Sequence, residues 1–406
     1  IILQMASRQQ RAGFHTVNVS DARRRETYSF TIPTRYKNLK FINAGSEGAV
    51  VSADDEDSNK KVAIKKRTNT VVGSWSATHA IREFILLSSL NHPNIIRILN
   101  IFTPQEDVQN FKDIYLVMEL MDHNISQVIS KMRLDHASLK FFIYQILCAV
   151  NHLHRQGIIH RDLKPCNIAV NKRCGVKVLD FGSSRMFTPI EQMSAYKTTT
   201  HYRAPEVLLE LTTLETRELR EVHRSHFSEK VDIWSIGCIF YELITGKIMF
   251  EGTETISQWR KVVETMGSPP ESFIAQLDAN LAKQIRSQPQ RTGKPLNKLI
   301  LDIHFYCDPA TCKKRAHTNM AADAGAARKL ISKLLEIDPK ARYSAAEALH
   351  HPYFSCYFNN DEVNAPLSKC VYDSAVDQGT LPLGELKSLI FQEVKRLESA
   401  QESARI

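Results

Sequence analysis

The chain has 406 residues, of which 43% are hydrophobic and 24% are charged, a composition typical of folded globular proteins. This length exceeds one ordinary compact core and predicts two lobes or domains. No run of about 18 apolar residues occurs, so we expect no membrane-spanning helix. The formal net charge of +9 is spread along the chain, which favours a solvated basic surface over a nucleic-acid-binding patch.

The eight cysteines give the expected compartment and raise one alternative. The apolar stretch 1–5 is too short for a secretory core, so we expect reduced thiols in a cytoplasmic protein, with nuclear entry as a further expectation. His304, Cys307, Cys312 and His317 could be proposed as a metal site. Their spacing fits no established zinc pattern, and a surface loop is the favoured alternative.

The first part of the chain is predicted to be rich in strands. Residues 1–33 are polar and basic, and we expect a flexible tail. Residues 36–65 contain β-branched residues in alternation, punctuated by glycine and acidic residues, which predicts short strands. Residues 76–90 predict a helix, and residues 113–120 a buried strand. The expected buried side of that helix carries Ile81, Phe84, Ile85 and Leu87.

The pattern then changes to helices. The stretch "SLKFFIYQILCAVNHLHRQG" places apolar residues at helical spacing and ends at Gly157. "NIAV" and "VKVLD" predict a small hairpin around "NKRCG". Residues 231–246 are apolar on nearly all sides, which predicts the central buried helix of a larger helical lobe.

Two blocks in the strand-rich part suit phosphate binding. Gly45 and Gly48 lie in a turn between strands, where glycines let the backbone approach phosphate oxygens closely. Lys65 ends the strand "VAIK", and Glu83 lies on the following helix. A lysine held over phosphates needs a carboxylate partner, and this helix can supply it.

The stretch "HRDLKPCN" at 160–167, followed by "DFG" at 180–182, carries further polar side chains suited to phosphoryl transfer. The Asp162 carboxylate can accept or orient a hydroxyl proton, and Lys164 can neutralise charge on a transferred phosphoryl group. Asn167 and Asp180 offer hard oxygen ligands that suit Mg²⁺. Phosphoryl transfer depends on positioning and charge neutralisation, and this set supplies both.

With these blocks in order, the chain resembles a eukaryotic protein kinase over residues 36–354. Within that superfamily it is similar to the mitogen-activated protein kinases, and most similar to the c-Jun N-terminal kinases. The resemblance is carried by stretches such as "YLVMELMDHNISQVI", "GIIHRDLKPCNIAV", "DIWSIGCIFYELITGKIMFEG" and "ISQWRKVVETMGSPP". It implies an α+β, bilobal protein kinase fold with a small β-rich N-lobe and a larger helical C-lobe.

The resemblance also implies the organisation of the chain. The expected segments are the flexible tail 1–33, the N-lobe 34–119, the hinge 120–124, the C-lobe 125–354 with an insertion at about 210–228, and an extension 355–406 that packs back on the N-lobe.

ATP and Mg²⁺ are the cofactors that the resemblance implies. Asp162, Lys164 and Asn167 would be catalytic, and Asn167 and Asp180 would hold the metal. The ATP-binding set would comprise the phosphate loop, the lysine–glutamate pair, the hinge and the apolar lining: Asn43, Gly45, Gly48, Val50, Ala63, Lys65, Glu83, Met118, Glu119, Met121 and Leu179. Ordinary core packing is the alternative explanation of its apolar members. As structural supports, Asp232 would anchor the catalytic loop and Glu206 would pair with Arg342.

Residues 180–206 would form the activation segment. Ser194 and Tyr196 stand where relatives carry a Thr-x-Tyr pair, so both are expected to be phosphorylated. Phosphates there would bring charge near −2 each and dock against arginines. The expected phosphate clamp consists of Arg82, Arg161 and Arg203.

The expected activity is that of an ATP-dependent serine/threonine kinase in stress-type signalling, with a preference for Ser or Thr followed by Pro. Expected partners are such substrates, an upstream dual-specificity kinase, and scaffold and phosphatase docking proteins. We expect no nucleic-acid or membrane partner, and we expect the chain to be a monomer. Asn43 replaces the first glycine of the phosphate loop, and Ser183 follows Asp-Phe-Gly where leucine is usual. Thr200 stands where a second arginine for phosphotyrosine belongs, and Lys197 replaces a small apolar residue. These departures motivate an alternative, a catalytically weak relative that acts as a signalling scaffold.

Overall fold

The computed structural model describes residues 11–45, 48–68, 73–186, 200–209, 228–305, 320–367 and 381–403. The chain divides into two compact units. Unit 1 comprises Ile1–Asn91, Ile96–Met121 and Lys369–Ile406, and unit 2 comprises His92–Ile95 and Asp122–Ser368. Among the described helices, none is long and apolar enough to cross a membrane.

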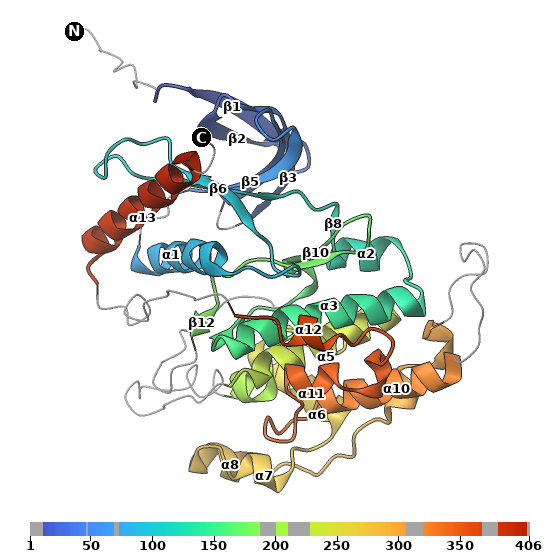
Figure 1. Cartoon of the computed structure of the whole chain (residues 1–406). Coiled ribbons are helices and arrows are strands. Elements are labelled where there is room, and N and C mark those ends of the chain that lie inside the picture. The colour runs from blue at the N-terminus through green and yellow to red at the C-terminus, as the bar shows by residue number, and fades with distance from the viewer. Residues whose placement is uncertain are drawn as a thin grey trace. The chain divides into compact units, whose positions relative to one another are not determined.

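An antiparallel sheet with strand order β3-β4-β5-β7-β6 forms the centre of unit 1 (Figure 1). Residues that pair across neighbouring strands share a face, and successive residues alternate between faces. The register therefore sorts the strands' side chains into two sets, described below. The strands are β3 (Tyr36–Gly45), β4 (Gly48–Asp55), β5 (Lys60–Arg67), β6 (Ile98–Phe102) and β7 (Ile114–Glu119).

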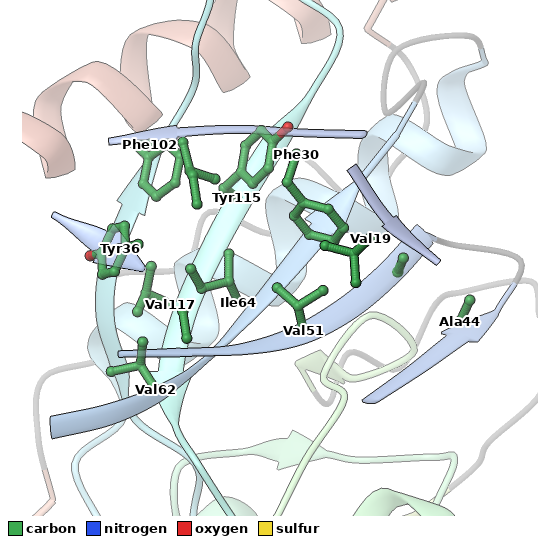
Figure 2. Packing of buried hydrophobic residues seen from close by; sticks show 13 residues of the cluster. Val19, Phe30, Tyr36, Ala44, Val51, Val62, Ile64, Phe102, Tyr115 and Val117 are labelled. Atoms are coloured by element: carbon green, nitrogen blue, oxygen red, sulfur yellow. The ribbon is translucent and has the colours of Figure 1, made fainter. Parts of the chain in front are cut away.

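One set forms the core of unit 1. Val51, Ile64 and Val117 are directly paired across β4, β5 and β7, and each is at most 1% exposed. Figure 2 shows Val19 and Phe30 lying beside this face. Burying such apolar side chains contributes about 1.5–3 kcal/mol each before conformational entropy is counted. The buried cluster consists of Val19, Phe30, Ile32, Tyr36, Ala44, Ala49, Val51, Ala53, Val62, Ile64, Phe102, Tyr115 and Val117.

The expected flexible tail is wrong for most of its length. Residues Phe14–Asp21 form β1 and Glu26–Pro33 form β2, which pair as an antiparallel hairpin. Phe30 and Ile32 of this hairpin are fully buried in the core of unit 1. Three of the basic residues that suggested a tail, Arg23, Arg24 and Arg25, lie at the hairpin turn and are exposed to solvent.

Two helices complete unit 1. In α1 (Ser74–Ser89), three of the four expected positions are buried, but Leu86 is buried where Ile85 was expected. The C-terminal helix α13 (Leu383–Ser403) packs against α1 and β6 (Figure 1). Its buried apolar residues follow one helical stripe at a spacing of four, and they are Leu386, Ile390 and Val394.

The extension 355–406 does not form one piece, contrary to expectation. Its first part belongs to unit 2, where Asn151 donates a hydrogen bond to the carbonyl of Val363 at 2.9 Å. Its last part, including α13, belongs to unit 1, where Lys387 donates to the carbonyl of Gln109 at 2.8 Å.

Unit 2 is mainly helical, and together with the sheet of unit 1 this confirms the expected α+β class. Its central helix α5 (Lys230–Thr245) is buried on nearly all sides, as its uniformly apolar sequence predicted. The neighbouring helix α3 (His136–Arg155) begins at Asp135, whose carboxylate accepts a hydrogen bond from the N–H of Ser138. The other helices are α2 (Ile125–Lys131), α6 (Thr255–Met266), α7 (Glu271–Ile274), α8 (Ala279–Arg286), α9 (Leu296–Leu299), α10 (Met320–Leu334), α11 (Ala345–Leu349) and α12 (Asn360–Val363), with 3₁₀ turns η1 (Pro165–Asn167), η2 (Asp302–Phe305) and η3 (Pro352–Phe354).

Short strands of unit 2 bracket the "HRDLKPCN" stretch. The predicted hairpin is present as β10 (Ile168–Val170) and β11 (Val176–Val178), and β8 (His123–Asn124) adds to it. A second pair joins β9 (Ile158–Ile159) to β12 (Arg185–Met186). The stretch therefore begins directly after one small sheet and ends directly before another.

We expect Ile390→Ala to lower the free energy of unfolding by about 2–5 kcal/mol, because it leaves a cavity under α13. Leu389→Ala, at a neighbouring position that is 39% exposed, should change it by less than about 0.5 kcal/mol. Urea unfolding followed by circular dichroism measures both. Equal losses in the two variants would contradict the burial of this face of α13.

Candidate active site

The chemistry-bearing residues form two groups, one in each unit. In unit 1, the Nζ atom of Lys65 on β5 lies 2.6 Å from Oε1 of Glu83 on α1, as the sequence predicted. The Glu83 side chain is 2% exposed and that of Lys65 is 15% exposed. A buried carboxylate needs a paired cation, and the partial exposure of Lys65 leaves its ammonium open to a solvent-borne anion.

The apolar residues predicted to surround adenine in unit 1 share the sheet face of Lys65. Val50 pairs directly with Lys65, and Ala63 pairs directly with Met118. These side chains lie on the face opposite the Val51–Ile64–Val117 core, so the main core of unit 1 does not account for them. Glu119 ends β7.

The two predicted loop glycines differ in whether the surrounding structure leaves room for a side chain. Gly48 has a φ of 137°, and a Cβ there would lie 1.9 Å from the carbonyl oxygen of Lys66, so the fold itself requires glycine. A Cβ at Gly45 would meet no described atom within 4 Å, so packing among the described residues does not require glycine there. Asn43 is exposed on β3 next to an irregularity in its pairing with β4.

In unit 2, the predicted catalytic residues lie within hydrogen-bonding distance of one another. The Lys164 ammonium donates to Oδ2 of Asp162 at 2.7 Å. The Asn167 side-chain amide donates to the carbonyl oxygen of Asp162 at 2.9 Å and to its Oδ2 at 3.2 Å. Burial alone would lower the pKa of Lys164, but the charge of Asp162 and their hydrogen bond outweigh it and raise the pKa. Lys164 therefore stays cationic beside the carboxylate at neutral pH.

Asn167 and Asp180 fit the requirements of a magnesium site. Because the amide nitrogen of Asn167 faces Asp162, its Oδ1 atom is the one available as a ligand. Asp180 supplies a carboxylate directly after Leu179, whose N–H donates to the carbonyl of Asn167 at 2.8 Å. Within the described ranges, no cluster of three or more His, Cys, Asp or Glu residues could hold a metal ion. Few protein ligands suffice for Mg²⁺, which keeps several waters and binds phosphate oxygens.

The "HRDLKPCN" stretch at 160–167, called the catalytic stretch below, is anchored by Asp232 of α5, as predicted. Its carboxylate accepts hydrogen bonds from the N–H groups of His160 and Arg161, both at 2.8 Å, and lies 2.9 Å from Nε2 of His154. Arg161 has a left-handed φ of 69°, a conformation that costs non-glycine residues about 1–3 kcal/mol. The bond from its N–H to the buried carboxylate helps to hold this strained backbone.

A second predicted support is also present. Arg342 forms a two-pronged ion pair with Glu206, with nitrogen–oxygen distances of 2.8 and 3.0 Å. The Arg342 side chain is fully buried, and its guanidinium lies 5.2 Å from the ring centroid of Trp234. This pair fixes the position of the Ala-Pro-Glu stretch within unit 2.

Part of the expected regulatory set lies outside the described residues. The residues outside the described ranges include Ser194, Tyr196, Lys197 and nearly all of the insertion at about 210–228. Three of the four residues of the alternative His–Cys metal site also lie outside them. Of the expected phosphate clamp, Arg82 is buried in α1 of unit 1, whereas Arg161 and Arg203 are half-buried in unit 2. The structure thus assigns these arginines to two different units.

Sequence reasoning missed one charged residue next to this group. Arg67 on β5 forms an ion pair with Oε2 of Glu83. The available signal was its spacing of two from Lys65, because residues two apart on a strand share a face.

We expect Asp232→Asn to destabilise unit 2 by about 1.5–3 kcal/mol at neutral pH, because one hydrogen bond to a charged group is lost. Burial alone would raise the pKa of Asp232, but the hydrogen bond and charge of His154, together with His160, lower it below the ordinary value. Its stabilising effect is therefore complete above the unfolded-state pKa of about 4 and is lost as pH falls through the lower folded-state value.

Urea unfolding of both proteins between pH 3 and pH 8 tests this. The difference in unfolding free energy should stay constant above about pH 5 and shrink below about pH 4. A difference that grows as the pH falls would contradict the ionised state of Asp232 in the folded protein.

Comparison with known proteins identifies the family. Residues 36–354 match the protein kinase domain family. GLH-binding kinase 1 of Caenorhabditis elegans is 46% identical over 388 residues, which cover 95% of this chain and 94% of the relative. The stress-activated protein kinase JNK of Drosophila melanogaster is 41% identical over 385 residues, which cover 95% of this chain and 96% of the relative. The stress-activated protein kinase JNK of Suberites domuncula is 41% identical over 370 residues, which cover 91% of this chain and 96% of the relative. The predicted resemblance is confirmed: the chain belongs to the protein kinase family, as a serine/threonine kinase of the JNK-like, stress-activated mitogen-activated class.

Proposed function

We propose that the chain transfers the γ-phosphoryl group of ATP to serine or threonine side chains that are followed by proline. The observation that carries this proposal is the Asp162–Lys164–Asn167 cluster, anchored by the buried carboxylate of Asp232. Family membership supports the use of ATP. Proline direction is a general feature of the mitogen-activated class.

The geometry suggests a role for each member of this cluster. The substrate hydroxyl oxygen attacks the γ-phosphorus, its proton passes to the Asp162 carboxylate, and the bond from the γ-phosphorus to the bridging oxygen breaks to release ADP. Lys164 stabilises negative charge on the transferred group because its pKa is raised and it remains protonated. Asn167 orients Asp162 through its two hydrogen bonds to that residue.

We assign Mg²⁺ to Asn167 and Asp180 on the fit of their oxygen ligands. The ion, when bound, neutralises charge on the phosphates. Leu179 precedes Asp180, and its carbonyl lies 2.9 Å from Nε2 of His160. This contact and the bond from the Leu179 N–H to Asn167 connect the two metal-ligand segments within unit 2.

Nucleotide contacts in unit 1 follow from the same proposal. Lys65 contacts the phosphates while Glu83 holds it, and the loop at Gly45 and Gly48 lets the backbone approach them. Gly45 supports this role, because the described packing does not require glycine there. Adenine contacts are assigned to the apolar set and the hinge backbone: Val50, Ala63, Met118, Glu119 and Met121 of unit 1, and Leu179 of unit 2.

Regulation is proposed to act through the activation segment. Phosphates on Ser194 and Tyr196 would be bound by arginines, with Arg82 and Arg161 for the former and Arg203 for the latter. An upstream dual-specificity kinase would add them, and the protein would act in the cytoplasm and nucleus. The name of the C. elegans relative says that it binds GLH, and we extend from it only the expectation of a protein partner. The scaffold alternative gains no support, because the residue expected to contact the ATP phosphates, Lys65, and the expected metal ligands, Asn167 and Asp180, are all retained.

We expect phosphorylation of a Ser-Pro or Thr-Pro peptide by the purified chain to rise at least tenfold after treatment with an activating dual-specificity kinase. Ser194→Ala and Tyr196→Phe should each prevent this rise, since each removes one acceptor hydroxyl. Peptide phosphorylation is measured by mass spectrometry, with the modification of residues 183–206 followed in parallel. A peptide with alanine in place of proline is the control for specificity. Full modification of both sites without turnover would contradict the proposal.

A further inference from the structure

Strand β5 places two cations next to each other on one face at its C-terminal end. Lys65 and Arg67 are two residues apart and therefore share a face, whereas Lys66 points to the other. The contacts agree with this alternation: the Lys66 ammonium lies 5.6 Å from the ring centroid of Tyr115 and donates to the carbonyl of Ser29 at 2.8 Å. Lys65 and Arg67 instead both contact Glu83 of α1.

The two cations bind different oxygens of one carboxylate. Lys65 contacts Oε1 of Glu83 at 2.6 Å, and an Nη atom of Arg67 donates to Oε2. The side chains of Glu83 and Arg67 are 2% and 3% exposed, whereas that of Lys65 is 15% exposed. Contacts at both oxygens restrict the rotation of the carboxylate, and they tie α1 to β5 at two points instead of one.

The difference in exposure separates the roles of the Lys65–Oε1 and Arg67–Oε2 contacts. The Lys65 ammonium is the more exposed of the two cations, so it can turn toward a solvent-borne anion while Oε2 keeps its contact with Arg67. Oε2 lies on the buried side with Arg67. A buried carboxylate oxygen that loses its partner is strongly unfavourable, because its desolvation is no longer offset.

We propose that Arg67 is a positioning residue for nucleotide binding, which holds Glu83 and α1 in place while the Lys65 ammonium is shared with a phosphate group. This inference rests on the proposed use of ATP. Lys65 thus engages the nucleotide without releasing α1, because Glu83 keeps its second, buried contact.

Kinetics test the role in nucleotide binding. We expect Arg67→Gln to raise KM for ATP about tenfold and to leave KM for the peptide within threefold of the wild-type value. Arg67→Lys should restore KM for ATP to within threefold, because an ammonium can still pair with Oε2. Lys61→Gln is the matched control, since it removes another cation of β5, one that is 67% exposed and pairs with Asp54. Unchanged kinetics in Arg67→Gln, or equal rises of both KM values, would overturn the proposal.

Hydrogen exchange tests the hold on α1 without relying on activity. In the nucleotide-free chain, Arg67→Gln should accelerate amide exchange in residues 77–89 about tenfold, whereas Lys65→Met should change it less than threefold. Equal acceleration in both variants would overturn the proposal. If the wild-type chain shows no kinase activity, the proposed function fails, yet this comparison still decides whether Arg67 holds Glu83.

A double variant covers the case in which Arg67→Gln does not fold. Arg67→Gln combined with Glu83→Gln removes both of the most deeply buried charges and leaves only the partly exposed Lys65 ammonium at this position, so the chain should fold. Its thermal melting transition would then be cooperative and within a few degrees of that of the single Glu83→Gln variant. Failure of the double variant to fold, where Glu83→Gln folds, would show that Arg67 acts through a group other than Glu83 and would overturn the proposal.

Discussion

The catalytic stretch of unit 2 depends on one buried carboxylate, that of Asp232. It accepts two backbone N–H groups from the stretch and lies against His154, and burial makes each of these bonds costly to lose. One of the donors belongs to Arg161, whose left-handed backbone would relax without it. Asp162 follows directly, so the position of the proposed base is set by a residue about 70 positions further along the chain.

Unit 1 also contains a buried carboxylate that fixes the groups around it, but its partners are different. Glu83 is a buried carboxylate that fixes side chains of β5, as Asp232 fixes backbone groups of the catalytic stretch. Buried ion pairs of this kind add little net stability compared with apolar packing, but losing one partner is expensive. Their effect is to make one geometry strongly preferred. In both units, the residues proposed to touch substrate are more exposed than the carboxylates that hold them.

The sequence predicted local features of this structure better than features that depend on long-range contacts. The sequence indicated the Asp162 cluster and the buried helix 231–246, because motif spacing and apolar periodicity determine them locally. It indicated the Lys65–Glu83 pair because a lysine held over phosphates needs a carboxylate partner. It did not indicate that residues 14–33 form a hairpin, since their basic turn masked the alternation of Val17, Val19, Phe30 and Ile32. The contact of Arg67 with Glu83 was also missed, because no motif marks Arg67 and its only signal was its spacing of two from Lys65. Likewise, assigning residues 355–367 to unit 2 required contacts such as that between Asn151 and Val363, which no local pattern encodes.

The most direct test of this account compares peptide phosphorylation by the wild-type chain and by Asp162→Asn, each with both activation-segment sites modified. Turnover should fall by about 10²–10⁴-fold in Asp162→Asn, because a positioned proton acceptor is lost. The dissociation constant for ATP, measured by calorimetry on the same samples, should stay within a few-fold of the wild-type value. Equal turnover in the two proteins, or no turnover in either, would contradict the assignment of Asp162 as the catalytic base of an active kinase.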